Sequence, residues 1–230
     1  MKVIAAFVFA GFLGTAVMAY GGTIVIDNFT CADSVSTTGP VFARNVISCA
    51  SAIGGARGDS IFFTGGSGSS SSTLTSGGGE ITGTIGSGLT GVDILGWFGT
   101  TTPGVFDLPN LDLVGDSILV QIKSDTAGTL DATFGSGSVA SANLLSFSTT
   151  FAASSSFVDV LIPLTDPAVL GTGANLNDVT AIGLQVGVPG GGTWTIDGVA
   201  AVPEPSTLLL TGICFLGILK RSIWRRSSRQ

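Results

Sequence analysis

Residues 182–188 read Ile-Gly-Leu-Gln-Val-Gly-Val, and this stretch carries the pattern that decides the fold. Its aliphatic residues occupy every second position, and small or polar residues fill the positions between them. Successive side chains of a β-strand point to opposite faces, so a period of two predicts a strand with one buried face. Residues 118–123 and 130–134 alternate in the same way.

Further candidate strands surround these three segments in both directions along the chain. They comprise residues 23–29, 61–64, 80–85, 92–98, 144–151, 158–162 and 194–199. About ten strands separated by Gly, Pro, Asp and Asn turns, with no long amphipathic helix, predict an all-β sandwich of two sheets. A jelly roll is the specific topology that we expect.

The composition permits a real hydrophobic core but argues against helices. Hydrophobic residues make up 44% of the 230 residues, and there are 35 glycines. Glycine loses the most backbone entropy on folding, and Ser and Thr compete with helical hydrogen bonds. We expect one β-sandwich domain over residues 20–201, with a flexible Gly/Ser loop at residues 65–79.

Charge is distributed unevenly along the chain. The formal net charge is −6, but only Arg44, Arg57 and Lys123 are basic between Gly21 and Ala201, where fourteen residues are acidic. The central domain therefore carries about −11. This sign argues against nucleic acid as a partner, because a phosphate backbone is bound through positive charge.

The N-terminal residues 1–19 are typical of a secretory signal peptide. Lys2 provides the positive start, and Val3 to Leu13 form an apolar run too short to span a bilayer, which needs roughly 20 residues. The small residues before Tyr20 predict cleavage between Ala19 and Tyr20. A short core helix or a membrane anchor is the weaker alternative.

Export would let the domain cysteines oxidise. Cys31 and Cys49 lie in the central domain, whereas Cys214 lies in the C-terminal apolar run. A Cys31–Cys49 disulfide would add roughly 3 kcal/mol on the chain-entropy model. Two buried free thiols remain the alternative.

The C-terminal residues 202–230 contain three features in a fixed order. Val202, Pro203, Glu204, Pro205 and Ser206 are followed by an apolar segment, residues 207–219, which we expect to form a transmembrane helix. A basic tail at residues 220–230 then carries the stop-transfer charges Lys220, Arg221, Arg225 and Arg226.

This arrangement resembles the PEP-CTERM sorting signal of Gram-negative bacteria that produce exopolysaccharide. The resemblance implies recognition by an exosortase-type processing enzyme, with cleavage near Pro203-Glu204-Pro205. It implies that the protein sits transiently in the inner membrane through its C-terminal helix and then reaches the cell surface or extracellular matrix. A permanent, uncleaved anchor is the alternative.

Four short segments resemble the strand ends of carbohydrate-binding-type jelly rolls. They are Ile26-Asp27-Asn28-Phe29, Ile53-Gly54-Gly55-Ala56-Arg57, Asp178-Val179-Thr180-Ala181-Ile182 and Trp194-Thr195-Ile196-Asp197-Gly198-Val199. Such domains often hold a structural calcium near the first and last strands, and the resemblance implies Asp27 and Asp197 as its ligands. The alternative is that both acids face solvent or cap turns.

Candidate catalytic groups are few. The chain has no histidine, which excludes His-based triads and His zinc sites. A glycosidase would need two facing carboxylates, but nothing distinguishes such a pair among Asp107, Asp112, Asp116, Asp125, Asp131 and Asp159. Trp97 and Trp194 could stack on sugars, but their apolar strand contexts favour core packing.

We therefore predict a non-catalytic, exported surface or matrix protein that binds exopolysaccharide, and we assign no catalytic residue. A secreted polysaccharide hydrolase with paired carboxylates is the alternative from another class. A permanently membrane-anchored surface domain is the third.

Overall fold

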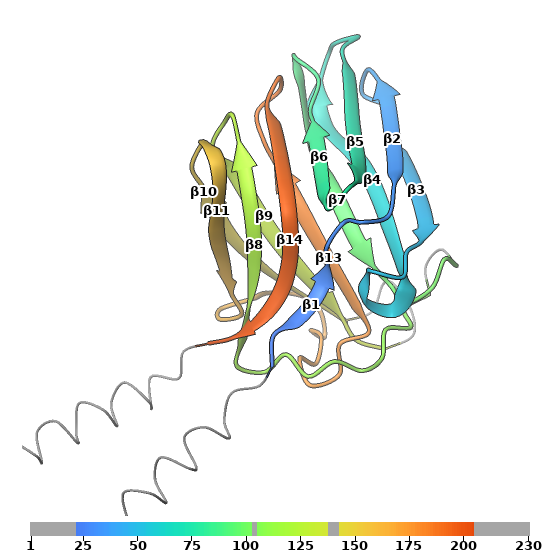
Figure 1. Ribbon diagram of the computed structural model, residues 1–230, viewed down its shortest axis with the longest axis vertical. Coiled ribbons are helices and arrows are strands. Elements are labelled where there is room, and N and C mark those ends of the chain that lie inside the picture. The colour runs from blue at the N-terminus through green and yellow to red at the C-terminus, as the bar shows by residue number, and fades with distance from the viewer. Residues whose placement is uncertain (1–21, 103–104, 138–142, 205–230) are drawn as a thin grey trace, which may run out of the picture. The chain divides into compact units, whose positions relative to one another are not determined.

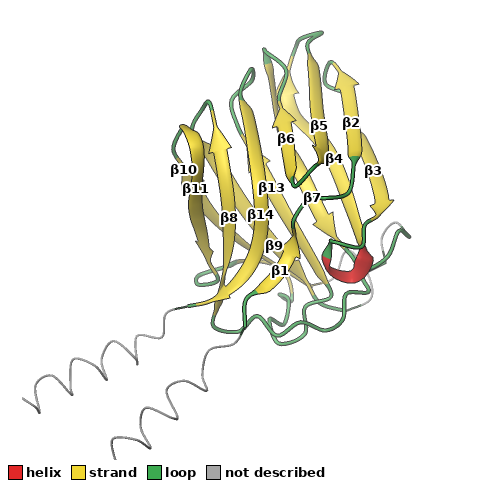
Figure 2. Cartoon of the chain, viewed as in Figure 1, coloured by secondary structure: helices red, strands yellow, loops and turns green. Residues whose placement is uncertain are grey.

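The computed structural model describes residues 22–102, 105–137 and 143–204. Residues Thr23–Val202 form one compact unit. Two antiparallel β-sheets face one another in this unit, which confirms the predicted two-sheet sandwich (Figures 1 and 2). The predicted signal peptide, most of the sorting motif, the apolar segment 207–219 and the basic tail lie outside the described residues.

The first sheet, called sheet A, has the strand order β11-β8-β14-β6-β5-β2, and β1 pairs with β14 beside this path. Its strands are β1 (Ile24–Asp27), β2 (Asp33–Thr38), β5 (Ser71–Gly77), β6 (Glu80–Thr84), β8 (Asp116–Ser124), β11 (Ser154–Pro163) and β14 (Thr193–Pro203).

The second sheet, called sheet B, has the order β12-β10-β9-β13-β7-β4-β3. Its strands are β3 (Ala43–Ser48), β4 (Ala56–Gly66), β7 (Leu89–Trp97), β9 (Gly128–Gly135), β10 (Asn143–Phe151), β12 (Ala168–Gly171) and β13 (Ala181–Gly187). A short 3₁₀ turn, η2 (Ile53–Gly55), precedes β4 (Figure 2).

The core lies between the sheets, where the alternation of the sequence places it. Ile182, Leu184 and Val186 of β13 are at most 2% exposed, and they face the inner positions of sheet A. The corresponding residues of β8 and β9 are also buried. The outer positions of β9 and β13 are small or polar because they face solvent, whereas β8 also carries Leu119 at an outer position.

The segment 65–79, predicted as a flexible loop, is mostly strand. β4 continues to Gly66, and residues 71–77 form β5, which pairs with β2 and β6. Leu74 is 1% exposed, so one aliphatic side chain anchors the strand in the core. Ser72 and Ser76 fill the other inner positions because their hydroxyls find partners: Gly86 N–H donates to Ser72 Oγ at 2.8 Å, and Ser76 Oγ donates to the Cys31 carbonyl at 3.0 Å.

The first and last strands of the domain are neighbours. β1 pairs antiparallel with β14, and Ile24 lies opposite Ala201. Among the described residues, no helix is long and apolar enough to cross a membrane.

Candidate functional site

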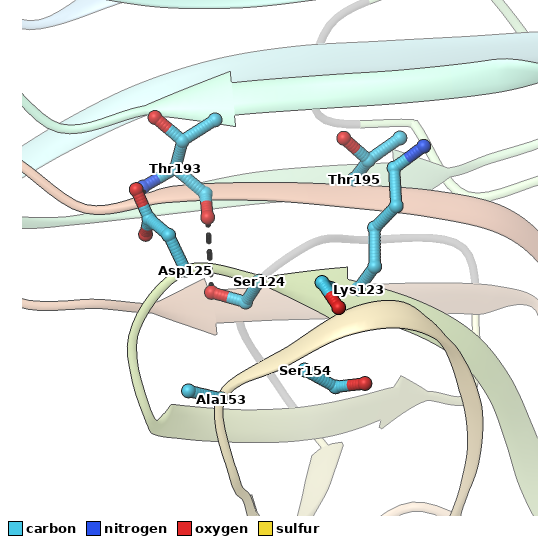
Figure 3. A pocket seen from close by; sticks show the side chains of 8 residues that line it. Lys123, Ser124, Asp125, Ala153, Ser154, Thr193 and Thr195 are labelled. Atoms are coloured by element: carbon cyan, nitrogen blue, oxygen red, sulfur yellow. Dashed lines mark hydrogen bonds between the residues drawn. The ribbon is translucent and has the colours of Figure 1, made fainter.

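A pocket of about 480 Å³ lies where β8 ends, β14 begins and the turn between β10 and β11 passes over them (Figure 3). This volume is within the range of small-ligand sites. Its lining is rich in hydroxyl groups and consists of Lys123, Ser124, Asp125, Ala153, Ser154, Ser155, Thr193 and Thr195. No local sequence pattern marks these residues as a group, because they come from three separate segments of the chain.

Backbone pairing between β8 and β14 makes one end of the pocket rigid. Thr193 N–H donates to Asp125 Oδ1 at 2.8 Å, and Asp125 N–H donates back to the Thr193 carbonyl at 3.1 Å. Ser124 Oγ donates to the same carbonyl at 3.0 Å (Figure 3). These contacts hold Asp125 in place. The bond from Thr193 N–H uses Oδ1 of its carboxylate and does not involve Oδ2.

Lys123 lines the pocket and contacts an aromatic ring that lies beside this lining. Lys123 Nζ lies 4.3 Å from the ring centroid of Phe157 on β11 and 3.4 Å from Glu80 Oε2 on β6. The Lys123 and Glu80 side chains are 35% and 46% exposed, so water screens their ion pair. Phe157 is itself half-buried, which leaves part of its ring at the surface.

Threonine pairs extend the polar surface away from the pocket across sheet A. Thr195 and Thr82 hydroxyls lie 3.0 Å apart, and Thr193 and Thr84 hydroxyls lie 3.2 Å apart. Each hydroxyl can donate one hydrogen bond and accept two, so each keeps capacity for a ligand. The arrangement suits a ligand rich in hydroxyl groups.

The pocket has one carboxylate in its lining, that of Asp125. A glycosidase of the paired-acid type needs a second carboxyl group across the sugar ring. The other acids considered in the sequence are dispersed: Asp131 lies on β9 of sheet B, Asp159 lies on β11 of sheet A, and Asp112 caps a turn by accepting from Val114 N–H. The pocket therefore does not bring together the two carboxylates that the hydrolase alternative requires.

Trp97 and Trp194 pack in the core, as their apolar contexts predicted. Both are 0% exposed. Trp97 Nε1–H donates to Asp27 Oδ2 at 3.0 Å, and Trp194 Nε1–H donates to Asp93 Oδ2 at 2.8 Å. Neither ring reaches the surface to stack on a sugar.

Asp27 belongs to a buried ion cluster, which corrects its assignment as a calcium ligand. The Arg57 guanidinium donates to Asp27 Oδ2 at 3.1 Å and to Asp59 Oδ1 at 2.9 Å, and all three residues are at most 1% exposed. Arg57 also contacts Ser76 and lies 5.3 Å from the Phe29 ring centroid. Burial raises the pKa of Asp59 to about 7, while Arg57 opposes this shift.

Asp197, the other expected calcium ligand, is exposed on β14. The terminal strands do pair, but Asp27 lies opposite Val199 and its side chain faces the core. The two carboxylates therefore do not meet: Asp27 is buried among core residues, whereas Asp197 is exposed on β14. Within the described ranges, no three acidic, Cys or His side chains gather as metal ligands.

Asp93 is a third buried acid, and unlike Asp27 and Asp59 it has no cation beside it among the described residues. Its Oδ1 has no hydrogen-bond partner in the part of the chain that the structure describes. Burial raises the pKa of Asp93 to about 7, and the Trp194 hydrogen bond opposes the shift. Gly83 lies so close that an added Cβ would sit 2.3 Å from Asp93 Oδ2, so no larger residue fits there.

The predicted disulfide is present. Cys31 and Cys49 are bonded, with their Cα atoms 5.7 Å apart. The bond connects the segment after β1 to the end of β3, beside the Arg57 cluster. Disulfides persist mainly in oxidising compartments, so this bond is typical of a protein outside the cytoplasm.

Only part of the predicted sorting motif lies in the described residues. Val202 and Pro203 end β14, and Glu204 follows it. Pro205, Ser206, the stop-transfer residues and the predicted cleavage position at Ala19 and Tyr20 lie outside the described ranges.

The fold defines the class: an all-β, two-sheet antiparallel sandwich. No family model matches the sequence, and no curated protein matches it. A family 11 carbohydrate-binding module from Clostridium thermocellum, solved in complex with a β-1,3-1,4-mixed-linked tetrasaccharide, is similar in structure at 14% identity and a TM-score of 0.42. The match covers 79% of this chain and 96% of that chain.

A family 29 carbohydrate-binding module complexed with cellulohexaose is similar at 12% identity and a TM-score of 0.39. This match covers 80% of this chain and 94% of that one. Both similarities are distant and concern the two-sheet fold.

Proposed function

We propose that this protein is an exported, non-catalytic surface or matrix protein that binds polysaccharide through the pocket between β8 and β14. The single observation that carries the proposal is the pocket itself, whose lining combines hydroxyl groups and one carboxylate with a lysine that lies against an aromatic ring. Sugars present hydroxyl groups at the ring edge and C–H groups on the ring face. Polar side chains match the first, and an aromatic face matches the second.

Charge favours an uncharged polymer. The domain carries about −11, and the nearest cation, Lys123, is already paired with Glu80. An acidic polysaccharide would be repelled at low salt, whereas a neutral one would not. The jelly-roll topology expected from the sequence is compatible with binding a polysaccharide on the outer face of sheet A, where the pocket lies.

Export and sorting form the second half of the proposal. The signal peptide at residues 1–19 and the tail at residues 202–230 would direct the chain through the inner membrane, where an exosortase-type enzyme would cleave near Pro203-Glu204-Pro205. The Cys31–Cys49 disulfide supports an oxidising destination. The processed domain would then remain at the cell surface or in the matrix.

The binding test is affinity electrophoresis of the domain in gels that contain hydroxyethyl cellulose, galactomannan or alginate. We expect retardation by at least one neutral polymer and none by alginate, without release of reducing ends. Lys123→Ala and Phe157→Ala should each weaken binding by about tenfold, the loss expected for one hydrogen bond from a charged donor or one stacking contact.

Gln121→Ala is the matched control. Gln121 lies on the same face of β8 two residues before Lys123, and its amide binds Asp159 outside the pocket. Its loss should leave retardation unchanged. Equal mobility of all proteins in every gel, or release of reducing ends, would refute the binding proposal.

The sorting test is the intact mass of the protein recovered outside its cells. A chain that begins near Tyr20 and ends near Pro203 to Ser206 would support both cleavages. A mass that still includes residues up to Gln230 would refute the sorting proposal and leave the permanent anchor.

A further inference from the structure

The outer face of sheet B carries a pair of exposed aromatic rings on the side of the sandwich away from the pocket. Phe42 is 56% exposed and Phe62 is 46% exposed. Their ring centroids are 6.3 Å apart, and the ring planes meet at 70°. Exposed phenylalanine pairs need an explanation, because burying these rings would stabilise the fold.

The strand register fixes the direction of both rings. Ala43 lies opposite Ile61, and Ile61 is fully buried in the core, so the neighbouring residues Phe42 and Phe62 point outward. Phe62 lies opposite Val92 of β7, which is half-buried. The three side chains form a short apolar ridge that runs from the residue before β3 across β4 to β7.

Polar side chains follow on the same face. Gln185 of β13 lies opposite Asp131 of β9, and Gly187 of β13 lies opposite Thr129 of β9. Gln185 and Asp131 are half-buried, and neither side chain has a hydrogen bond within the described residues. Neighbouring strands are about 4.8 Å apart, so the surface from β4 to β9 spans about 14 Å.

We propose that this surface, formed by Phe42, Phe62, Val92, Gln185 and Asp131, is a second binding site for an uncharged polysaccharide chain. One domain would then bridge two chains. This inference rests on the proposed function for its ligand class, and it adds a second site and a cross-linking role.

The surface suits a sugar chain better than a protein. Its apolar part consists of the two rings, Val92 and the half-buried Ile94 of β7, and the rest offers an amide, a carboxylate and a hydroxyl. A stable protein interface buries about 800 Å² on each partner around an apolar centre, which these side chains do not provide. A second copy would also meet the repulsion of two domains that each carry about −11.

Bridging follows from the two-layer fold. The pocket opens on the outer face of sheet A, and the aromatic ridge lies on the outer face of sheet B, with the hydrophobic core between them. Packed sheets are about 10 Å apart, and their outer faces point in opposite directions. A single stiff chain cannot contact both faces, so each face would hold its own chain.

The test compares two double variants of the full domain, Phe42→Ser with Phe62→Ser and Lys123→Ala with Phe157→Ala, and the quadruple variant that combines both pairs. Leu170→Ser is the control, because Leu170 is 53% exposed on the edge strand of sheet B far from the ridge. Circular dichroism and thermal unfolding would establish that each variant folds. The probe is galactomannan, or whichever neutral gel polymer retards the wild type most.

Wild type should raise the viscosity of the polymer solution, and calorimetry with oligosaccharides of that polymer should give two sites per domain. Each double variant should retain one site and lose the rise in viscosity, and the combined variant should lose both sites. One site in the wild type, with the Phe variant unchanged, would overturn the bridging inference and leave the pocket proposal standing.

Retardation by no polymer would instead overturn the proposed function and this inference together. A third outcome would also overturn the second sugar site. In it, the viscosity rise disappears in the Phe variant, calorimetry gives one site per domain, and sedimentation shows a dimer only in the wild type. The ridge would then be a contact between two copies of the chain.

Discussion

Asp93 shows how a single residue couples the stability of the core to pH. Its carboxyl group is buried beside Trp194 with no cation in contact, and burial raises its pKa from 3.8 to about 7. Between these values the folded protein keeps the proton and the unfolded chain releases it. The contribution of Asp93 to the free energy of unfolding is therefore greatest below about pH 4, and it falls as the pH rises towards 7.

Asp93→Asn should flatten this dependence. The amide oxygen can still accept the Trp194 hydrogen bond, and no proton is lost between pH 4 and 7. Urea unfolding of the wild type should lose up to about 1.4 kcal/mol per pH unit from this group, and the variant should lose less. The free energy of unfolding of the variant will still fall somewhat with pH, because the pKa of Asp59 is also raised.

The control for this measurement is Asp197→Asn, on the exposed face of β14. It should unfold with the pH dependence of the wild type. A steep wild-type slope that Asp93→Asn leaves unchanged would show that Asp93 is not its source.

Arg57 is the one buried cation among the described residues, and it balances Asp27 and Asp59. Arg57→Met should destabilise the domain by about 3–5 kcal/mol, because it leaves buried carboxylates without a counter-charge. Chemical unfolding at pH 7 would measure this loss. The loss should shrink at pH 5, where Asp59 is protonated, and a loss below 1 kcal/mol at both values would contradict this role.

Strand β5 could not be predicted from the alternation of aliphatic residues that marks the other strands. Strands β8, β9 and β13 could be predicted because their aliphatic residues alternate with polar ones. β5 alternates Ser72, Leu74 and Ser76 on its inner face, and two of these three are polar. Only the tertiary structure supplies Gly86 and Cys31 as partners for the two hydroxyls, so the composition alone favoured a loop.

The order of this strand can be tested through Leu74. Leu74→Ala should lower the free energy of unfolding by about 2–5 kcal/mol, because it leaves a cavity in the core. Thr73→Ala, one residue earlier on the exposed face, should change it by less than about 0.5 kcal/mol. Equal small effects of both changes would mean that the segment is a loop after all.

The disulfide joins two segments that the sheets alone hold weakly. Its cysteines are 18 residues apart, so replacing both with Ser should cost about 3 kcal/mol on the chain-entropy model. Hydrogen exchange should quicken around residues 28–33 and 48–57 and stay slow in β9 and β13. Uniform loss of protection would instead indicate that the whole sandwich depends on the bond.

The whole molecule brings together residues that no local pattern connects. Ser124 and Thr193 meet in the pocket although they are 69 residues apart. The sequence predicted the sandwich, the disulfide and the core role of both tryptophans, because each has a local signal. It did not predict the pocket or the aromatic ridge, because each requires knowing which strands are neighbours.

The same limit explains the calcium prediction. The sequence indicated correctly that the first and last strands meet, but not that Asp27 faces inward to Arg57 while Asp197 faces outward. A chelator should therefore leave the melting temperature of the domain unchanged. A drop on chelation that calcium reverses would contradict this expectation, because a ligand of the native state must raise stability.

Strand β14 has a mechanical consequence. The pocket lies at its first residues, Thr193 and Thr195, and whatever follows the domain leaves from its last residue, Pro203. Eleven residues separate these ends by about 30 Å along one strand. If a polymer pulls on the pocket while the tail is held, tension runs along β14. Its hydrogen bonds to β8 and β6 are then loaded in shear and share the force. A sheet resists force in this direction better than force that opens its hydrogen bonds one by one.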